Sequence, residues 1–443
     1  MKKERDQWGS KLGFILAAAG SAVGLGNIWR FPYITGKYGG AAFVLVYLAV
    51  VVFIGMSVML AELTLGRKGK LDSVSTLRKL GGGAWPLVGW MGFVACAILL
   101  SFYAVIAGWT FAYMIKSFTG LMAVAAAGGT KAEFLNFIAD PVYTMACFLL
   151  VMGIVVSIVH KGISGGIEKA CKVLMPVLFL ILLTLIVRSV TLEGAMKGVE
   201  FYLKPDFSKL TSEAIIAAVG QGFFSLSIGV GIILTYGSYL SDKESLPSVT
   251  AHVVILDTVV AILAGFVIFP AVFAFGMDPG SGPGLAFITL PCVFSKMPFG
   301  AFFSSAFFTL LFFASVTSAI SILEVVVTYA VDQLHMTRKK GSYIFGFWIT
   351  LLGIPSALSQ GAVEITICGK SFLDAMDFFA NNIMMPVGGL AMAIFVSWVW
   401  HEGAKQEITN NGTVDFPLYN VWLWSCRIIA PLAIALIFVT GLF

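Results

Sequence analysis

Two short stretches of the sequence combine glycine with small polar residues in the middle of long apolar segments. The first, 19–27 (AGSAVGLGN), holds three glycines, and the second, 225–231 (SLSIGVG), places two serines beside two glycines. Glycine disfavours a helix interior by about 1 kcal/mol per residue, and serine hydroxyls compete for backbone hydrogen bonds. Both stretches therefore predict interrupted helices, whose freed carbonyls attract cations and whose freed amides attract anions. Close packing through small residues is the alternative for either stretch taken alone.

Ionisable residues within apolar segments are the other candidates for a functional role. Asp257 lies about eight residues into such a segment, roughly 12 Å deep along a helix. A carboxylate at that depth stays ionised only if it is paired. Glu62 and Glu324 are also expected to be buried, bonded either to backbone at a helix break or to water.

The remaining residue types exclude several classes of function. The four histidines lie far apart, so a metal centre has no support, and no nucleophile–base constellation points to an enzyme. The GxG at 24–26 lacks the preceding strand that a dinucleotide-binding loop needs. The six cysteines lie singly, mostly in apolar runs, as small hydrophobes do; Cys292 and Cys368, in predicted outer loops, could pair. Basic residues cluster in short loops, not on one face, which excludes a nucleic-acid binder.

The elements that position these residues are helices of membrane length. Of the 443 residues, 59% are hydrophobic and 12% charged, whereas a soluble domain is about half apolar and about a quarter charged. Runs of about 20 apolar residues match the thickness of a bilayer core. The sequence predicts an all-α membrane protein with eleven transmembrane spans: 12–36, 41–66, 87–118, 139–159, 166–190, 214–240, 249–275, 300–332, 342–360, 372–400 and 418–442.

The distribution of lysine and arginine predicts the orientation. These residues are denser in segments that share a side with the N-terminus, such as 67–79 and 338–340, so we predict a cytoplasmic N-terminus. The first apolar run is expected to be a retained helix and not a signal peptide, because it is long and glycine-rich and carries Asn27 and Arg30. Segment 283–296 is apolar but short, which predicts a re-entrant or lid helix.

The two interrupted stretches fall in the first and sixth of the eleven spans. They occupy corresponding positions of two five-helix halves, 12–190 and 214–400, which 418–442 follows as an eleventh helix. An inverted repeat with broken helices 1 and 6 is typical of secondary transporters, whose sites lie at mid-membrane. We therefore predict one transporter domain over 1–443.

Five stretches and two aromatic residues resemble the neurotransmitter:sodium symporter family over nearly the whole chain. They are 20–32 (GSAVGLGNIWRFP), 39–43 (GGAAF), 220–227 (GQGFFSLS), 312–318 (FFASVTS) and 372–378 (FLDAMDF), with Tyr103 and Trp109. The resemblance implies the fold of the bacterial leucine transporter and sodium-coupled amino-acid symport by alternating access.

The resemblance also implies two sodium sites and a substrate site. A first sodium ion would be held by Ala22, Asn27, Ser225 and Asp257 with the substrate carboxylate, and a second by Gly20, Val23, Ala314, Thr317 and Ser318. The substrate would contact Ala22, Leu25, Gly26, Leu99, Tyr103, Phe224, Ser227, Val230, Ser318 and Ile322. Its carboxylate would meet the amides of Leu25 and Gly26 and the hydroxyl of Tyr103, since a helix N-terminus binds an anion without an arginine.

Two pairs of charges resemble the gates of the family. Arg30 and Asp377 correspond to the outer gate, which closes directly or through water. Arg5 and Asp332 correspond to the cytoplasmic gate, with Trp8 and Tyr239 beside it. Without the resemblance, Arg5 would equally suit an anchor at the cytoplasmic face of the membrane.

The family pattern also bears on chloride and on the substrate. The family commonly has asparagine at the position of Asp257, and a chloride ion or a glutamate one turn away, where this chain has Ala261. We therefore expect chloride-independent transport. Gly20-Ser21-Ala22 stands where monoamine carriers place an acid, which favours α-amino acids. Val230 and Ile322 leave an apolar pocket that suits hydrophobic or aromatic ones.

The expected partners are an amino acid, two sodium ions and the lipid of the cell membrane, without nucleic acid. The family often has twelve helices, so eleven leave dimerisation open. The alternative is a non-transporting amino-acid sensor of the same fold, against which the two intact gate pairs argue.

Overall fold

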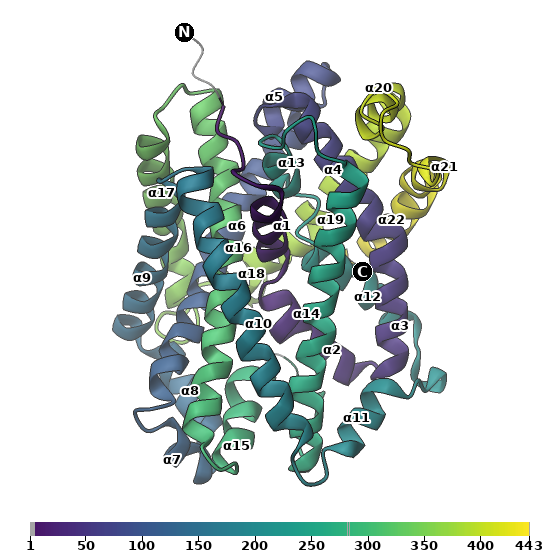
Figure 1. Cartoon of the computed structure of the whole chain (residues 1–443). Coiled ribbons are helices and arrows are strands. Elements are labelled where there is room, and N and C mark those ends of the chain that lie inside the picture. Colours follow the sequence, from purple (N-terminus) through teal and green to yellow (C-terminus); the bar gives the residue numbers. More distant parts are fainter. Residues whose placement is uncertain (1–4, 281, 283, 443) are drawn as a thin grey trace.

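The computed structural model describes residues 5–280, 282 and 284–442. Its helices run mostly along one direction, and the end that carries the N-terminus is at the top of Figure 1. That end corresponds to the predicted cytoplasmic side.

The first half of the chain is helical from Lys11 to Val190 apart from short connections. Three π-helical turns precede or extend these helices: Gly26–Arg30, Val51–Gly55 and Ile163–Glu168. A fourth, Leu285–Thr289, lies in the second half of the chain. The helices are α1 (Lys11–Ala22), α2 (Phe31–Lys37), α3 (Ala41–Val50), α4 (Met56–Gly69), α5 (Ser73–Leu80), α6 (Pro86–Lys116), α7 (Leu121–Ala126), α8 (Thr130–Ala139), α9 (Pro141–Val159) and α10 (Lys169–Val190).

The second half repeats this helical character and adds one small hairpin. Its helices are α11 (Met196–Leu203), α12 (Ser212–Ser225), α13 (Ile232–Gly237), α14 (Leu246–Ala274), α15 (Leu290–Ser295), α16 (Gly300–Asp332), α17 (Arg338–Leu358), α18 (Phe372–Phe378), α19 (Met385–Ile394), α20 (His401–Ile408), α21 (Tyr419–Trp424) and α22 (Ala430–Leu442). The strands β1 (Thr366–Ile367) and β2 (Lys370–Ser371) pair antiparallel. A 3₁₀ turn spans Phe207–Lys209, and further π-helical turns span Phe379–Met384, Phe395–Val399 and Ser425–Ile429.

The number of spans is lower than predicted when each helix is judged by length and composition. Within the described residues, nine helices are long and apolar enough to cross a membrane, and the bent pair α1 and α2 makes up to ten. The predicted sixth span, 214–240, consists of α12 and α13, each too short to cross alone. The count of eleven is therefore not confirmed, and the interruption within 214–240 is the reason.

The first predicted break lies where glycine and small residues were expected to interrupt the helix. Helix α1 ends at Ala22, Val23 is extended, and the Gly26–Lys37 helix leaves at an angle of 50° to α1. A Cβ on Gly24 would stand 2.6 Å from Ser318 Oγ and 2.8 Å from the Tyr103 hydroxyl. Only glycine lets the chain pass this closely to two polar side chains.

The second break is longer and more strained. Between α12 and α13, Ser227, Gly229 and Gly231 all have positive φ, which L side chains rarely adopt. A Cβ on Gly229 would also approach the Met385 carbonyl oxygen to 2.2 Å. Glycine is therefore required there for both the backbone conformation and the contact with α19.

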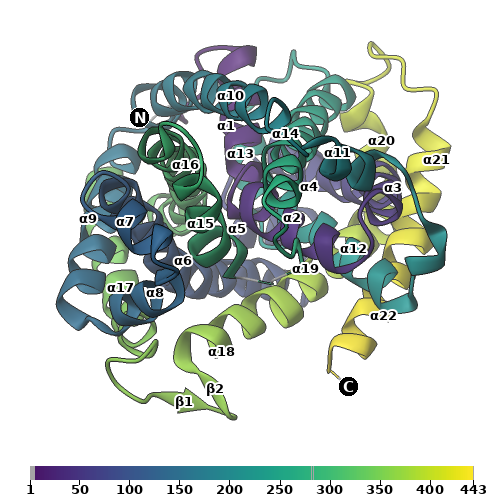
Figure 2. The ribbon, with the colours of Figure 1, turned by 90° about the horizontal axis from the view of Figure 1, so that it is seen from below.

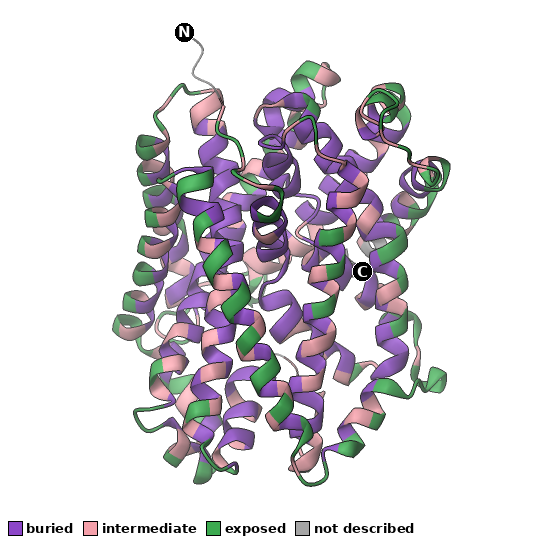
Figure 3. Cartoon of the chain, in the orientation of Figure 1, coloured by how far each residue is buried: buried purple, intermediate pink, exposed green. Residues whose placement is uncertain are grey.

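The broken helices lie inside the bundle. Helix α1 contacts α10, α14 and α16, and α13 contacts α4 and α16, an arrangement that Figure 2 shows from the opposite end. Figure 3 shows the purple buried positions along these inner helices and the green exposed positions on the outward faces of α9, α10 and α17. The predicted lid helix is present as Leu285–Ser295, and its predicted first residue, Pro283, lies outside the described residues. Cys292 and Cys368 are free thiols.

Candidate functional site

A small cavity of about 30 Å³ lies between the two interrupted segments. Of the ten residues predicted to contact substrate, all except Leu25 line it, namely Ala22, Gly26, Leu99, Tyr103, Phe224, Ser227, Val230, Ser318 and Ile322. Residues that the sequence reasoning missed complete the wall: Ser21, Gly24, Ile232 and Met385. Spacing within one helix gives no sign that α19 reaches this cavity, so Met385 could be found only from the packing of α19 on the second break.

Polar groups of both breaks converge on this cavity. The Leu25 amide donates to the Tyr103 hydroxyl at 3.2 Å. The hydroxyls of Ser227 and Ser318 both donate to the Ser21 carbonyl, each at 3.0 Å. The hydroxyls of the cavity wall, with the Leu25 amide behind Tyr103, suit an anion, and the carbonyls suit a cation, as the freed backbone predicts.

Three members of the predicted first ion-binding set form one buried cluster, and the fourth, Ala22, lines the cavity. Asn27, Ser225 and Asp257 are all fully buried. Asn27 Nδ2 donates to Asp257 Oδ1 at 2.7 Å and to Ser225 Oγ at 2.9 Å, and Ser225 Oγ donates to Asp257 Oδ2 at 2.8 Å. Tyr47, which was not predicted, donates to Ser225 Oγ at 3.2 Å. Two hydroxyls and one side-chain amide therefore gather beside a single carboxylate.

The hydroxyls of the predicted second ion-binding set are engaged in hydrogen bonds with carbonyl groups. Thr317 Oγ1 donates back to its own helix, to the carbonyls of Phe313 and Ala314 at 3.1 and 3.0 Å. Ser318 reaches across to the first break, where its hydroxyl lies 3.5 Å from the Gly20 carbonyl. The neighbouring Val23 amide is bonded to Ala19 at 2.6 Å. These residues lie on facing helices α1 and α16, which are in contact.

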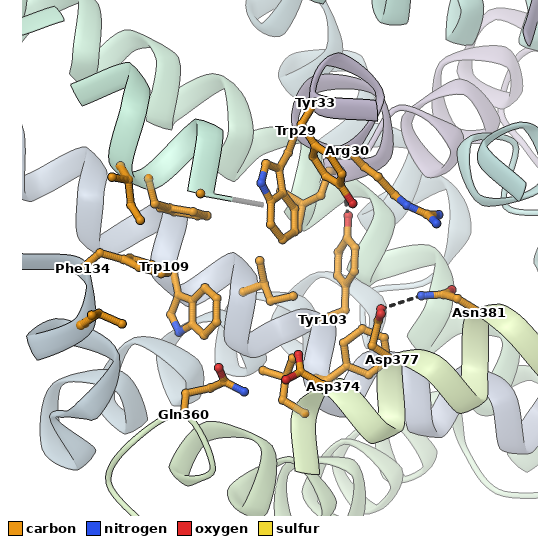
Figure 4. A pocket seen from close by; sticks show the side chains of 18 of the residues that line it. Trp29, Arg30, Tyr33, Tyr103, Trp109, Phe134, Gln360, Asp374, Asp377 and Asn381 are labelled. Atoms are coloured by element: carbon orange, nitrogen blue, oxygen red, sulfur yellow. Dashed lines mark hydrogen bonds between the residues drawn. The ribbon is translucent and has the colours of Figure 1, made fainter. Parts of the chain in front are cut away.

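A second, larger cavity of about 340 Å³ lies on the outer side of the first. Leu25, Tyr103 and Phe224 line it, and the last two also line the inner cavity. Figure 4 shows its aromatic wall, with Trp29, Tyr33, Trp109 and Phe134, and its polar rim, with Gln360, Asp374 and Asn381. The Phe287 ring of the lid segment packs against Trp29 and Trp109, with ring centroids 6.0 Å apart in both cases.

The predicted outer gate pair is present but not joined. The Arg30 guanidinium lies over the Phe224 ring, 4.7 Å from its centroid. Asp377 accepts a hydrogen bond from Asn381 Nδ2 at 2.7 Å, which Figure 4 shows as a dashed line. Among the described residues, no ion pair links Arg30 to Asp377. The expected direct closure is therefore absent in this conformation, in which each member of the pair contacts another side chain.

The predicted inner gate is closed. Arg5 donates to both carboxylate oxygens of Asp332, at 2.9 and 2.7 Å, and its guanidinium lies over the Tyr239 ring at 4.6 Å. Trp8 Nε1 donates to the Tyr236 carbonyl at 3.1 Å, and the two rings meet edge to face. These contacts close the bundle on the N-terminal side of the central cavity, which is the predicted cytoplasmic side.

The structure adds a second ion pair to the inner end that sequence reasoning missed. Arg338 binds both carboxylate oxygens of Glu324, at 2.7 and 2.9 Å, and Glu324 is fully buried. Arg338 also reaches Asp6 at 3.3 Å, and Tyr239 donates to Glu324 at 2.8 Å. The buried acid in an apolar run was a visible signal, but its partner is the first residue of the next helix, α17, and could not be chosen from the sequence.

Two further buried side chains hold the breaks in place. Glu62 accepts hydrogen bonds from the amides of Gly229 at 2.6 Å and Leu234 at 3.4 Å, on either side of the second break. This is the backbone partner expected as one option for Glu62. Gln221, which was not singled out, donates to the Gly26 carbonyl at 2.8 Å and so links the two broken helices.

Comparisons with known proteins agree with this geometry. The family model described as the sodium:neurotransmitter symporter family matches residues 5–133 and 135–443. The chain is 40% identical over 435 residues to the sodium-dependent transporter YhdH of Bacillus subtilis, covering 98% of this chain and 96% of that protein. It is 38% identical over 455 residues to a sodium-dependent transporter of Haemophilus influenzae, covering 100% of this chain and 99% of that protein.

A solved structure is similar over the same length. The crystal structure of MhsT in complex with L-phenylalanine matches with a TM-score of 0.90 and 44% sequence identity, covering 99% of this chain and 100% of that chain. The two interrupted helices and the central cavity thus belong to a fold that has been solved with an amino acid bound.

Proposed function

Because the chain belongs to the sodium:neurotransmitter symporter family, it is a sodium-dependent transporter and not an enzyme, and we propose that it carries hydrophobic or aromatic L-amino acids into the cell. The observation that carries this proposal is the cavity between the two helix breaks, where an amide and hydroxyls meet an apolar wall. The first and sixth helices, 12–36 and 214–240, would tilt around it relative to the rest of the bundle, which serves as a scaffold. The N-terminus would lie in the cytoplasm and the chain in the cell membrane.

The polar half of the cavity suits the α-amino and α-carboxyl groups of a substrate. The Leu25 amide and the Tyr103 hydroxyl, 3.2 Å apart, would bind the carboxylate. The Ser21 carbonyl, which two serine hydroxyls now hold, lies on the same wall with Ala22. Carbonyls of this kind would accept hydrogen bonds from the ammonium group. An acidic side chain is not needed for that, which favours amino acids over amines.

The apolar half of the cavity suits a hydrophobic side chain. Leu99, Val230, Ile232, Ile322 and Met385 form this wall. The thioether of Met385 is flexible and adapts to ligands of different shape. MhsT, which is 44% identical, has been solved with L-phenylalanine, and this supports an aromatic substrate here. Such a wall discriminates by only about 1–3 kcal/mol per methylene, so several related amino acids would compete.

Substrate entry would come from the outer cavity. At about 30 Å³, the central cavity has the volume of roughly one water molecule, so it must widen to admit an amino acid. Phe224 lines both cavities and lies under the Arg30 guanidinium. We therefore expect the ring of Phe224 to move together with Arg30 when substrate passes. The closed inner gate matches a protein that is open toward the outside.

The first of the two sodium ions would bind at the Asn27–Ser225–Asp257 cluster. Sodium is a hard cation that prefers oxygen, and Asp257 brings a carboxylate to a site that is otherwise neutral. Asn27 now presents its amide nitrogen to Asp257, so the amide must turn by half a rotation to present its oxygen to the ion. The second sodium would take the carbonyls of Gly20, Val23 and Ala314 and the hydroxyls of Thr317 and Ser318. Because the substrate carboxylate completes the first site, each ligand would raise the affinity of the other by the same factor.

Uptake into proteoliposomes tests the substrate and the ions together. Labelled phenylalanine is offered with a sodium gradient, with potassium in place of sodium, and with all twenty amino acids as competitors. We expect sodium-dependent uptake that hydrophobic and aromatic amino acids inhibit most strongly. Binding without uptake would instead identify a sensor and contradict transport.

Replacement of chloride by gluconate tests the role that we assign to Asp257. With the carboxylate of Asp257 in the site, uptake should persist without chloride. In Asp257→Asn the site becomes neutral, and we expect uptake either to fail or to recover when chloride is added. Loss of most wild-type activity in gluconate would show that Asp257 does not replace the anion.

A further inference from the structure

A shallow groove lies between α9 and α17, on the outer surface of the bundle and away from the substrate path. It has a volume of about 260 Å³, and Leu149, Gly153 and Val156 of α9 face Tyr343, Gly346 and Phe347 of α17 across it. Figures 1 and 2 both show the two helices side by side at one edge of the molecule. Both belong to the apolar spans, Pro141–Val159 and Arg338–Leu358, so the groove faces the hydrocarbon of the bilayer.

The floor of the groove is open where the chain has glycine. A Cβ added to Gly153 would meet nothing within 4 Å, whereas one on Gly346 would stand 2.5 Å from a methyl carbon of Val156. The helices therefore touch at Gly346 and part at Gly153. The rings of Tyr343 and Phe347 are 50% and 59% exposed and form a wall beside this opening.

The hydroxyls of Ser157 and Thr350, which line the groove, are already satisfied. Ser157 Oγ donates to the Ile154 carbonyl, and Thr350 Oγ1 donates to the Gly346 carbonyl, each at 2.7 Å. Each hydroxyl thus bonds to its own helix and not across the groove. From Leu149 to Ser157 the groove extends roughly 12 Å along α9. It offers a continuous apolar surface to a chain-like ligand.

The cytoplasmic end of the groove is strongly basic. The ring of His160 lies 5.8 Å from the ring of Tyr343, at the point where the apolar lining ends. Lys161 follows on the same connection, and the next residue, Gly162, packs beside Arg338, since its Cβ would stand 3.9 Å from Arg338 Cδ. Lys339 and Lys340 come directly after this arginine, in the first turn of α17. Lys161, Lys339 and Lys340 are all exposed.

These three lysines form no ion pair with an acid among residues 5–280, 282 and 284–442. The nearby acids, Asp6 and Glu324, are both bound to Arg338. The amino-terminal end of α17, a helix of 21 residues, adds partial positive charge at the same place. An uncompensated positive charge therefore stands directly above an apolar groove.

We propose that this groove binds one anionic phospholipid of the cytoplasmic leaflet. An acyl chain would lie over Gly153 between Val156 and Phe347, and the headgroup phosphate would meet Lys161, Lys339 and Lys340. Basic pockets between helices on the cytoplasmic side are complementary to anionic headgroups. A second copy of this chain fits less well, because a two-fold interface would place Lys339 and Lys340 against the same lysines of the other copy. A free phosphate would use the lysines but not the groove.

Native mass spectrometry of the full-length protein tests the proposal without relying on transport. The protein is titrated in detergent with phosphatidylglycerol or with phosphatidylcholine, and the fraction that retains one lipid is measured. We expect wild type to retain phosphatidylglycerol in preference. The triple variant K161Q/K339Q/K340Q should lose this preference by about fivefold per lysine, which corresponds to about 1 kcal/mol each. The control K79Q/K243Q/K405Q, which removes three other exposed lysines, should bind as wild type does.

A second variant tests the groove separately from the charge. Gly153→Leu fills the open floor and improves helix propensity, so it should fold normally and reduce retention of phosphatidylglycerol. Val173→Leu, on the exposed face of α10, is the matched control and should change nothing. Equal retention of both lipids by wild type would overturn the proposal. A loss of lipid in K161Q/K339Q/K340Q without a loss in Gly153→Leu would also overturn it, because that result would indicate an anion site without an acyl groove. A dimer that contains no lipid and that Gly153→Leu abolishes would overturn it as well.

Discussion

The two ends of the substrate path carry similar charges but use them differently. At the inner end, Arg5 and Asp332 are joined at 2.7 Å. At the outer end, Arg30 lies over the ring of Phe224 at 4.7 Å, and Asp377 bonds elsewhere. A gate is therefore closed only when its two charged side chains are in contact, and the presence of opposite charges in the sequence is not sufficient.

The inner end is also the more deeply desolvated of the two. Its second pair joins Arg338 to Glu324, whose side chain is fully buried, and Tyr239 donates to the same carboxylate. A buried ion pair depends strongly on both partners, because either charge left alone is poorly solvated. Breaking contacts at the inner end should therefore have larger effects than breaking those at the outer end.

The largest effect is expected from Arg338→Met. The variant leaves the Glu324 carboxylate buried without a cation, at a cost of about 3–5 kcal/mol. Thermal unfolding in detergent should show a marked loss of stability. The double variant Arg338→Met with Glu324→Gln removes both charges and should recover most of it. A double variant as unstable as the single one would mean that the packing of Arg338 matters and not its charge.

A smaller but clear effect is expected from Arg5→Ala. This change removes charged hydrogen bonds to Asp332 and Ser238, worth about 1.5–3 kcal/mol, so the inner end should open in a much larger fraction of molecules. Distances between spin labels across the inner end measure that fraction. Arg30→Ala is the matched control at the outer end and should leave these distances unchanged. Unaltered distances in Arg5→Ala would show that the remaining contacts, those of Trp8 and Arg338, keep the inner end closed without Arg5.

Arg30→Met should affect transport more than stability. The variant loses the contact with the Phe224 ring, worth about 0.5–2 kcal/mol, and it can no longer close on Asp377. We expect a modest fall in the unfolding midpoint and a large fall in uptake. Asp377→Asn should reduce uptake to a similar degree with almost no change in stability, because this structure shows no bond between the two residues. Normal uptake in both variants would contradict an outer gate.

The smallest effect is expected from Asp72→Asn, beside the inner gate. Asp72 lies outside the membrane spans, caps α5 through the Val74 amide and donates its own amide to Asp332. Burial raises the pKa of Asp72 above its usual 3.8, and the charge of Asp332 adds to this. The protonated form is thus favoured in the fold, so this group helps stability below pH 3.8 and its contribution is lost as the pH rises through the folded pKa.

Asparagine keeps the cap and removes the desolvated charge. Asp72→Asn should therefore be slightly more stable than wild type at neutral pH and show a flatter dependence of unfolding on pH in the acid range. Unfolding curves recorded between about pH 3 and pH 7 measure both. A less stable variant at pH 7 would indicate that the ionised carboxylate is needed by the cap.

The helix breaks could be predicted because their causes are local. Residues 19–27 and 225–231 contain the glycines and serines that leave a helix unsupported, and the structure interrupts the chain within these same stretches. The burial of Asp257 and Glu62 follows equally from apolar neighbours in the sequence. The number of spans could not be predicted as firmly. In a broken helix made of two short pieces, such as α12 and α13, nothing in the local sequence shows that the two pieces together cross the membrane.

The residues that close the site could not be found in this way. Met385 reaches the cavity only because α19 packs on the Gly229 break, and Tyr47 joins the Asp257 cluster only because Ser225 lies beside it. Asn27 was predicted to hold sodium, and in this structure its side-chain nitrogen donates to Asp257. Each of these contacts joins residues from different helices.

The sequence alone determined where the membrane helices lie, where two of them break and which charges stand at membrane depth, since these depend on hydropathy and on conformational preferences of neighbouring residues. Which of these charges meet depends on how the helices pack. Arg5 and Asp332 are 327 positions apart, and their bond exists because packing brings α16 beside the N-terminal segment. Arg30 and Asp377 have equal chemical reason to pair, but in this conformation Arg30 lies over the ring of Phe224 and Asp377 bonds to Asn381.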